Sequence, residues 1–432
     1  MDDIDLGGFD SYQNLLAYLI PDREPSEGGQ DFSPAVRCQL KRLAMAAKGT
    51  RNACCMYPRC TTRNPLEVHH HKPRQFGGTG ELGNGVLLCR HHHPVVASFS
   101  IFPSDVQYFH AGVWHPSVQR LWEFRLEELA DRLHHLYGFA DFHHERAVLS
   151  KFNLIARILQ SAYIRRTEDA LLANRIVCWA SLMLTQPLVV LLDARRYRDH
   201  AKGHSRKFIR MLLATAEKHA HCAPEDPLLQ AMLFHMRAIN SNALGYLSTA
   251  GRQAARTESL LKRVSMLSMP IDLPGGFEDY IHAQNALIMA KTSSRKAIAL
   301  ATGAFESSRD KSLGDYIESL CALVKVNLLL SNDWRRAERL LKEAPASERR
   351  DKQLKVMTTL AYLRLSQGSF GECEAIAKEA RSLADATKRR HTVAKMEQLL
   401  DVIGNDRDSL KTQLRAARYS GRGLPHPIAR VL

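Results

Sequence analysis

Residues 55–60 read CMYPRC, and residues 66–93 read LEVHHHKPRQFGGTGELGNGVLLCRHHH. Four residues separate Cys55 from Cys60, and two separate Cys89 from His92. Paired thiolates and imidazoles at such spacings, each pair on a turn or at a helix start, are typical of a tetrahedral zinc site. The sequence therefore predicts a structural Zn²⁺ held by these four side chains.

A second set of polar side chains is interleaved with these ligands, and the zinc site does not need it. The set comprises His69, His70, Asn84 and His93. Its order resembles the HNH endonuclease family, also called the ββα-metal or His-Me finger. The positions that carry the resemblance are Glu67-Val68-His69-His70, Pro73, Gly77-Gly78, Leu82, Asn84, Leu87-Leu88-Cys89 and His92-His93.

The resemblance implies a strand, a loop, a second strand and a helix around a catalytic divalent cation, Mg²⁺ or Mn²⁺. In that arrangement His69 and His93 bind the cation beside the scissile phosphate, and His70 takes a proton from the attacking water. Asn84 ties the loop to the strand and orients His70. The implied activity is hydrolysis of DNA phosphodiester bonds.

Three positions leave the assignment of ligands open. His71 stands where the family usually has an aliphatic residue, and strand alternation puts it on the face of His69, as an extra ligand or as a filler. The run His91 to His93 leaves the register open, although the spacing from Cys89 favours His92 for zinc. Cys54 is interpreted as a bystander thiol. The alternative function is a non-catalytic, zinc-stabilised nucleic-acid-binding or adaptor protein whose helical repeats carry the main activity.

Charge is unevenly distributed along the chain, whose formal net charge is +15. Residues 34–96 hold ten Lys and Arg against two acids, which favours binding to a phosphate backbone. The predicted DNA contacts are Arg37, Lys41, Arg42, Lys48, Arg51, Lys72, Arg74 and Arg90. A helix is expected over residues 35–47. Residues 1–33 hold eight acids and one Arg, and we interpret them as an acidic N-terminal arm, either a partly disordered leader or a restraint on the DNA face.

We expect the nuclease domain to occupy residues 34–97, followed by an aromatic connector over 98–117 that forms a β-hairpin or an extended segment. From 118 to about 403 the apolar positions follow a helical period. Residues 118–225 form a helical region with a basic segment. Within it, residues 176–192 carry no charge and predict a buried helical hairpin that turns at Pro187, since the run is too short for a membrane span.

Weak repeats occupy residues 226–404. Trp334-x2-Ala337-x3-Leu341-x2-Ala344 is followed 36 residues later by Phe370-x2-Cys373-x3-Ala377-x2-Ala380, and preceded by Ala297-x3-Ala301-x2-Ala304. The pattern resembles tetratricopeptide (TPR) repeats, in which small residues let two helices pack closely. It departs from them in its longer period, in Arg364 where an aromatic residue is usual, and in a missing Pro. The alternative is an unrelated helical bundle.

The sequence thus predicts a mixed fold: a small zinc-stabilised ββα-metal domain followed by a mostly α-helical, TPR-like solenoid and a basic flexible tail over residues 405–432. The nine cysteines do not form a disulfide framework, which fits a reducing cytoplasm. The expected partner is DNA, with a protein, a peptide or a second copy of the chain on the repeats and no membrane.

Overall fold

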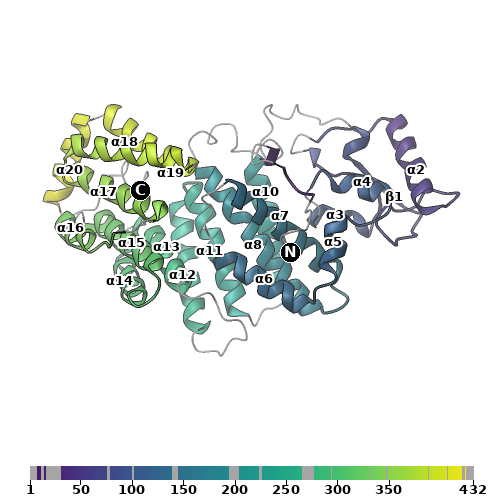
Figure 1. Ribbon diagram of the computed structural model, residues 1–432, viewed down its shortest axis with the longest axis horizontal. Helices are drawn as coiled ribbons and strands as arrows, with labels where there is room; N and C mark the ends of the chain where they lie inside the picture. The colour runs from purple at the N-terminus through teal and green to yellow at the C-terminus, as the bar shows by residue number, and fades with distance from the viewer. Residues whose placement is uncertain are drawn as a thin grey trace. The chain divides into compact units, whose positions relative to one another are not determined.

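A computed structural model of the chain describes residues 7–10, 14–15, 31–74, 78–99, 102–138, 145–193, 204–222, 226–264, 277–292, 294–331, 333–346, 349–387, 389–405, 407–420 and 424 (Figure 1). The chain divides into two compact units. Unit 1 comprises residues 1–139, 145–188 and 200–224, and unit 2 comprises residues 140–144, 189–199 and 225–432. Helices dominate both units, and the described residues contain one two-stranded sheet, which lies in unit 1.

The elements that begin in unit 1 are α2 (Pro34–Lys48), β1 (Leu66–His70), the short 3-10 helix η2 (Leu82–Asn84), β2 (Gly85–Cys89), α3 (His92–Phe99), α4 (Asp105–His110), α5 (Pro116–Leu121), α6 (Leu126–Gly138), α7 (Glu145–Ile164), α8 (Ala170–Asp193) and α10 (His204–Ala220). The predicted helix over 35–47 is confirmed as α2. The hydroxyl of Ser33 caps its start by accepting the Val36 N–H at 3.3 Å, and Gly49 ends it in the left-handed region at φ 62°.

The two strands pair antiparallel, so that His69 lies opposite Val86 and His70 lies opposite Gly85. Every residue of β2 is buried, because this strand contacts α2, α3 and α4. β1 is exposed at Glu67 and buried at His69. The histidines of β1 therefore lie beside the buried strand β2. The helix that begins at His92 follows β2 directly in the sequence.

The aromatic stretch that was expected to form a hairpin or an extended connector is helical instead. Residues 105–110 form α4 and residues 116–121 begin the helical region as α5. The buried side chains Phe102, Val106 and Phe109 follow each other at steps of four and three, which is the spacing of one helical face. Pro and Gly residues on either side obscured this short helical period.

The uncharged run around Pro187 was also predicted wrongly, because α8 continues through it as one helix of 24 residues. The hydroxyl of Ser181 donates to the Val177 carbonyl at 2.8 Å, and Thr185 donates to the Ser181 carbonyl at 2.9 Å. These bonds satisfy the buried hydroxyls of Ser181 and Thr185 within the helix. Within the described part of the chain, no helix is both long enough and apolar enough to cross a membrane.

Part of the acidic N-terminal arm is packed against unit 1 rather than forming a free leader. Phe9 is buried, and its backbone N–H and C=O each bond the side-chain amide of Asn153 on α7 at 3.1 Å. Leu15 is also buried. Part of the predicted arm is therefore packed, and residues 1–6, 11–13 and 16–30 lie outside the described residues.

Unit 2 is built from α11 (Pro227–Ala243), α12 (Leu247–Val264), α13 (Phe277–Ala290), α14 (Lys296–Ser308), α15 (Leu313–Ser331), α16 (Trp334–Lys342), α17 (Arg350–Ser366), α18 (Phe370–Ala386), α19 (Arg390–Asn405) and α20 (Arg407–Tyr419). Consecutive helices pack in pairs, and α13, α15 and α17 also contact one another in sequence (Figure 1). The second helix of each pair, α14, α16 or α18, is the one that carries the repeated small residues. The contacts follow the order of the chain, as in a stack of helical hairpins.

The small residues of the repeats lie where two helices approach. Ala297, Ala337 and Cys373 are fully buried at equivalent places in α14, α16 and α18. Arg364, the departure from the repeat pattern, has a structural reason: it pairs with Glu338 of α16 at 3.1 Å and with Glu372 of α18 at 2.9 Å. One guanidinium thereby joins three helices where an aromatic side chain would pack.

The first prediction concerns His235, which is buried in unit 2 and whose Nδ1 lies 3.0 Å from the Asn285 amide oxygen. Burial lowers its pKa to about 4. The unfolded chain therefore binds the extra proton between about pH 6.5 and pH 4, and the free energy of unfolding falls as pH decreases, by about 1.4 kcal/mol per pH unit. His235→Leu should remove this pH dependence, measured by hydrogen exchange of α11 amides at about pH 7 and about pH 5. An unchanged slope in the variant would contradict the assignment.

Candidate metal centres

Four side chains converge at the end of the β1–β2 hairpin. The thiols of Cys55, Cys60 and Cys89 and a ring nitrogen of His92 all lie within 4.8 Å of one another. His92 Nδ1 is 3.2 Å from Cys89 Sγ and 3.7 Å from Cys55 Sγ. Among the described residues this is the one group of at least three such donors close enough to hold an ion, and His92, rather than His91 or His93, belongs to it.

The segment from Cys55 to Cys60 turns sharply, so that the thiols of these two residues lie close together. The Cys60 N–H donates to the Tyr57 carbonyl at 3.0 Å, and the Cys55 N–H donates to the Thr62 carbonyl at 2.9 Å. Arg59, between them, adopts a left-handed conformation at φ 63°, which is uncommon for a residue with a side chain. The tight turn brings the thiols of Cys55 and Cys60 close together, although four residues separate them in the sequence.

The imidazole of His92 is held in place by its neighbours. Its ring stacks on Tyr57 with centroids 3.8 Å apart and an interplanar angle of 9°. The ammonium of Lys48, at the end of α2, donates to the Tyr57 carbonyl at 3.1 Å. Lys48, which was predicted to contact DNA, therefore supports the cluster through Tyr57.

Burial and neighbouring groups shift the pKa of three of these side chains, Cys55, Cys60 and His92. Burial raises the pKa of the Cys55 thiol and, with the charges of His91 and Lys48, lowers the pKa of His92 to about 4. Burial opposes the thiolate of Cys60 as well, but hydrogen bonds from Thr62, Cys55 and Cys89 outweigh it and lower the pKa. A buried, uncompensated thiolate is unfavourable, so a metal ion is the natural counter-charge.

The donor set fits Zn²⁺. Zinc binds thiolate at about 2.3 Å and imidazole nitrogen at about 2.0 Å in a tetrahedron, which places its ligands roughly 3.5–4 Å apart. The separations of 3.2 and 3.7 Å and the limit of 4.8 Å agree with a single central ion. Three soft thiols and one imidazole also match the ligand types of closed, structural sites.

A second group lies on the side of β1 that carries Glu67 and His69, next to the first turn of α3. The rings of His69 and His93 meet edge to face with centroids 4.8 Å apart. His93 Nδ1 lies 2.9 Å from a carboxylate oxygen of Glu67. Glu67 was not among the predicted site residues, although its place two residues before His69 puts both on one face of the strand.

The side chain of His69 is only 5% exposed, and its Nε2 atom has no hydrogen-bond partner among the described residues. Burial, followed by the neighbouring imidazoles of His71 and His93, lowers its pKa to about 3. The ring is therefore neutral at physiological pH with an unused nitrogen. Buried polar atoms without partners are uncommon in folded proteins, and many of those that occur bind an ion or a water molecule.

His70 points to the other side of the strand, as the alternation predicts. It is half-buried, and its ring lies against Phe32 with centroids 4.1 Å apart.

The side chain of Asn84 accepts the Lys72 N–H at 2.6 Å and donates to the carbonyls of Lys72 and Thr79 at 3.1 and 2.8 Å. Asn84 thus ties the loop to the residues that follow β1.

His71 is not part of either group of donors. It is 3% exposed and its Nε2 donates to the Phe102 carbonyl at 2.7 Å.

Cys54 is buried beside Thr50 and stays outside the cysteine cluster. Of the glycine pair in the loop, Gly77 lies outside the described residues, and a Cβ on Gly78 would stand 1.8 Å from the Lys72 carbonyl oxygen. Gly78 is therefore required by close backbone approach.

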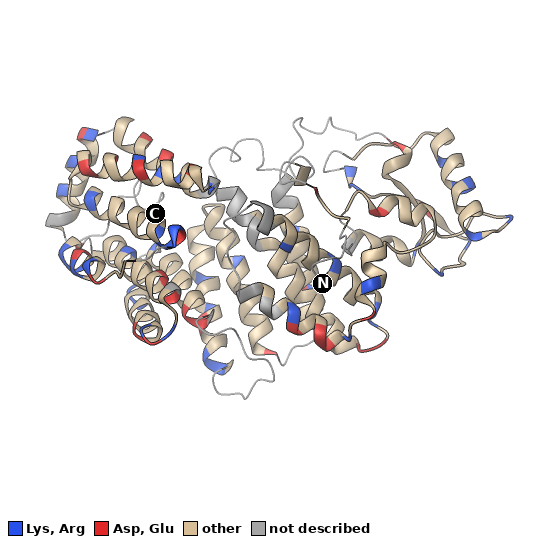
Figure 2. Ribbon diagram, in the orientation of Figure 1, with Lys and Arg blue, Asp and Glu red and all other residues tan. Residues whose placement is uncertain are grey.

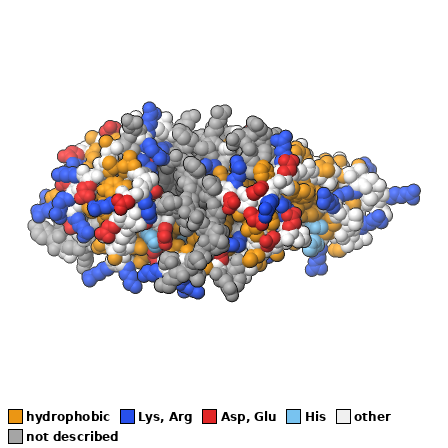
Figure 3. Space-filling model, turned by 60° about the horizontal axis from the view of Figure 1, so that its bottom comes forward, with side chains coloured by type: hydrophobic (Ala, Val, Ile, Leu, Met, Phe, Trp, Pro, Cys, Tyr) orange, Lys and Arg blue, Asp and Glu red, His pale blue; other side chains and the backbone are white. Residues whose placement is uncertain are grey.

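Most predicted DNA contacts are exposed, namely Arg37, Lys41, Arg42, Arg51, Arg74 and Arg90, whereas Lys48 and Lys72 are half-buried. Lys and Arg lie along α2 and its neighbouring loops (Figure 2), and histidines reach the surface of this part of unit 1 beside them (Figure 3). Burial lowers the pKa of Lys72. Arg74 pairs with Asp31 at 3.0 Å. Of the basic segment predicted after Asp193, residues 194–203 lie outside the described residues.

Comparison of the chain with models of known protein families, with curated proteins and with solved structures finds no match.

The second prediction separates the two groups of ligands. Cys60→Ser or Cys89→Ser should release bound zinc and unfold the hairpin region, because structural zinc contributes folding free energy directly. His93→Ala should keep the zinc. Cys54→Ser is the matched control, since this thiol is as buried as that of Cys89 but lies outside the cluster, and the zinc content of this variant should equal that of the wild type. The zinc content per chain of each variant, measured by atomic emission, shows which residues bind the zinc. Loss of zinc from His93→Ala but not from His92→Ala would contradict the ligand assignment.

Proposed function

We propose that this protein is a metal-dependent endonuclease of the HNH type that hydrolyses DNA phosphodiester bonds. The proposal rests chiefly on the pair His69 and His93: two imidazoles with ring centroids 4.8 Å apart, one of which is buried with an unpartnered nitrogen. A zinc-binding module that only stabilises its own fold has no need for this pair. The order of β1, β2 and α3 around the pair agrees with the resemblance seen in the sequence.

In this proposal His69 and His93 hold a divalent cation, Mg²⁺ or Mn²⁺, which would supply charge stabilisation at the scissile phosphate. Glu67 accepts the Nδ1–H of His93 and thereby leaves Nε2 of that ring free as a donor atom. A carboxylate behind a metal-binding imidazole fixes its tautomer and raises its basicity. The Cys55, Cys60, Cys89 and His92 group holds the structural Zn²⁺.

His70 is the general base of the proposed reaction. Its imidazole lies on the opposite side of β1 from His69, is half-exposed, and is steadied by the ring of Phe32. A neutral imidazole there can take a proton from a water molecule as that water attacks phosphorus. Asn84 holds the loop that follows, so the backbone at the end of β1 keeps its direction.

The exposed cations of unit 1 support binding of the DNA backbone. Guanidinium and ammonium groups on α2 and the neighbouring loops neutralise phosphates without reading sequence. The helical pairs of unit 2, which resemble TPR repeats, would bind a protein or peptide partner or a second copy of the chain. Stacked helical hairpins commonly provide extended binding surfaces of that kind.

The third prediction concerns His70. His70→Ala should abolish Mg²⁺- or Mn²⁺-dependent cleavage of plasmid DNA while leaving zinc content and DNA affinity nearly unchanged, because a general base lowers the barrier and does not build the scaffold. His91→Ala is the matched control: the residue is exposed, belongs to the other histidine run, and should keep wild-type activity. Cleavage by the His70 variant at the wild-type rate would exclude the proposed base. A wild-type protein that binds DNA but never cleaves it would favour the non-catalytic alternative.

The fourth prediction tests Glu67. Glu67→Gln should lower the affinity for the catalytic cation and the rate of cleavage by about 10- to 100-fold, as is usual when the partner of a metal-binding histidine is lost. Glu81→Gln changes the net charge equally at another exposed position and should leave both unchanged. Titration of activity with Mn²⁺ gives the affinity of each variant. Equal Mn²⁺ dependence of the two variants would show that Glu67 has no role behind His93.

A further inference from the structure

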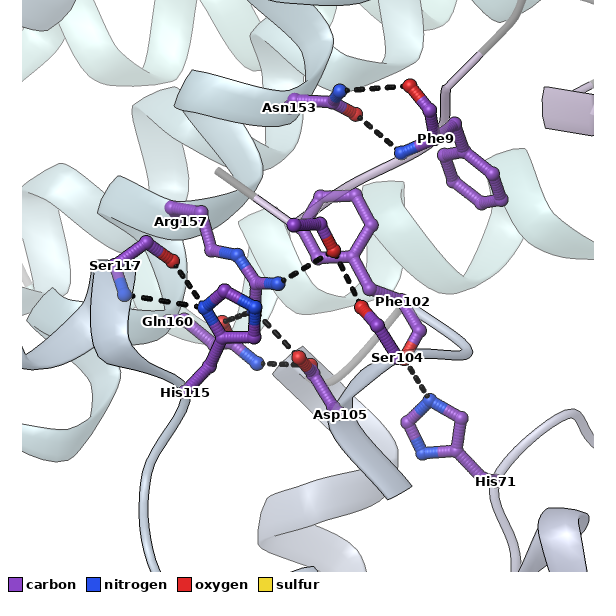
Figure 4. Close-up of polar contacts among 11 residues, drawn as sticks. Phe9, His71, Phe102, Ser104, Asp105, His115, Ser117, Asn153, Arg157 and Gln160 are labelled. Carbon is purple, nitrogen blue, oxygen red and sulfur yellow. Dashed lines mark hydrogen bonds and ion pairs between the residues drawn. The ribbon is translucent and has the colours of Figure 1, made fainter. Parts of the chain in front are cut away.

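One face of α7 carries three polar side chains that are almost completely removed from solvent. Asn153, Arg157 and Gln160 follow each other at steps of four and three, so they lie on one side of the helix (Figure 4). They are 8%, 0% and 2% exposed. All three bond residues that are distant in sequence. This buried polar face therefore joins separate segments of the chain.

Arg157 forms a buried ion pair with Asp105 on α4. Its Nη1 donates to Asp105 Oδ1 at 2.6 Å and to Gln160 Oε1 at 2.7 Å, and Gln160 Nε2 donates to Asp105 Oδ2 at 2.6 Å. Both carboxylate oxygens are therefore bonded by α7. Replacing a buried ion pair by well-packed apolar side chains is often neutral or stabilising, so stability alone does not account for this arrangement.

The N-terminal segment closes the same cluster from the other side. The Gly7 carbonyl accepts a bond from Arg157 Nη2 at 3.1 Å and another from the Ser104 hydroxyl. A Cβ on Gly7 would lie 2.0 Å from His115 Nε2, and one on Gly8 would lie 2.3 Å from Asn153 Cγ. Only glycine permits so close an approach, which means that the segment is fitted to this seam.

The cluster extends to His71, the residue that directly follows β1. The Phe102 carbonyl accepts both the Asp105 N–H at 2.9 Å and His71 Nε2 at 2.7 Å, and the guanidinium of Arg157 lies 4.3 Å from the centre of the Phe102 ring. The His71 N–H in turn donates to the Asn84 carbonyl at 2.8 Å. The side chain of His71 is thus connected to α4 and α7 through Phe102 (Figure 4), and its backbone is bonded to the loop beside β2.

We propose that His71 and Arg157 are positioning residues of the nuclease site, which hold the end of β1 so that His69 and His70 keep their directions. This inference rests on the proposed function. A five-residue strand paired with only one partner is weakly restrained at its end, and the bond to Phe102 fixes the residue that follows both proposed catalytic imidazoles. α7 lies outside the segment that resembles the nuclease family, so the site depends on a helix whose sequence gives no hint of it.

The full-length, zinc-loaded protein provides the test. His71→Leu removes the bond to the Phe102 carbonyl, whereas His71→Gln keeps a donor at the place of Nε2. The leucine variant should lose about 10- to 100-fold in kcat with little change in KM or zinc content, because small displacements of a reacting group have effects of this size. The glutamine variant should recover to within about threefold of the wild type. Equal losses in both variants would overturn the proposed role of this hydrogen bond.

A double variant, Asp105→Leu with Arg157→Met, examines the cluster without touching a histidine and leaves no buried charge unpaired. The ¹⁵N spectra of labelled histidines supply a measurement that needs no cleavage. In the leucine variant and in the double variant the His69 and His70 imidazole signals should shift or broaden, while those of exposed His91 should not. Unchanged His69 and His70 signals together with unchanged kcat would overturn the inference. If these signals shift but the wild type cleaves no DNA, the positioning role stands and the proposed nuclease function fails.

Discussion

The pairing of β1 with β2 is the constraint on which the candidate site depends. Each strand has only five residues, and a two-stranded ribbon of this length is at best marginally stable alone. The hairpin is therefore held from outside. The group of three cysteines and His92 closes one end of it, and the buried pair of Arg157 with Asp105, through Phe102 and His71, secures the other. The first support comes from residues within or beside the hairpin in sequence, whereas the second includes Arg157 of α7, which is far from both strands.

The sequence was sufficient for the parts of the site that depend on spacing. The four donors that converge are the four expected from the two cysteine-containing pairs, and the strand ending at His70 and the helix over 35–47 are present. Local periodicity and ligand spacing are properties of short segments, so they can be interpreted without knowledge of the fold. The helical character of the chain after residue 118 was predicted on the same basis.

What the sequence did not predict depends on contacts between distant segments. Arg157 is 52 residues from Asp105 and 150 from Gly7, and nothing in the composition of α7 connects it with a strand histidine. The aromatic stretch before Trp114 and the continuous helix through Pro187 were misjudged because local breakers suggested turns, whereas burial and side-chain bonds within the helix decided the outcome. Glu67 could have been found, since strand alternation alone places it beside His69.

The two histidine runs show how backbone geometry assigns different tasks to identical residues. In the strand, successive side chains alternate, so His69 and His71 face the interior while His70 turns toward Phe32. At the start of α3 successive side chains are rotated by about 100°, which sends His91 to solvent, His92 to the thiols and His93 to His69. In the proposed nuclease, cation binding, proton transfer, anchoring and zinc ligation are therefore separated by direction, and a shift of either run by one residue would exchange their tasks.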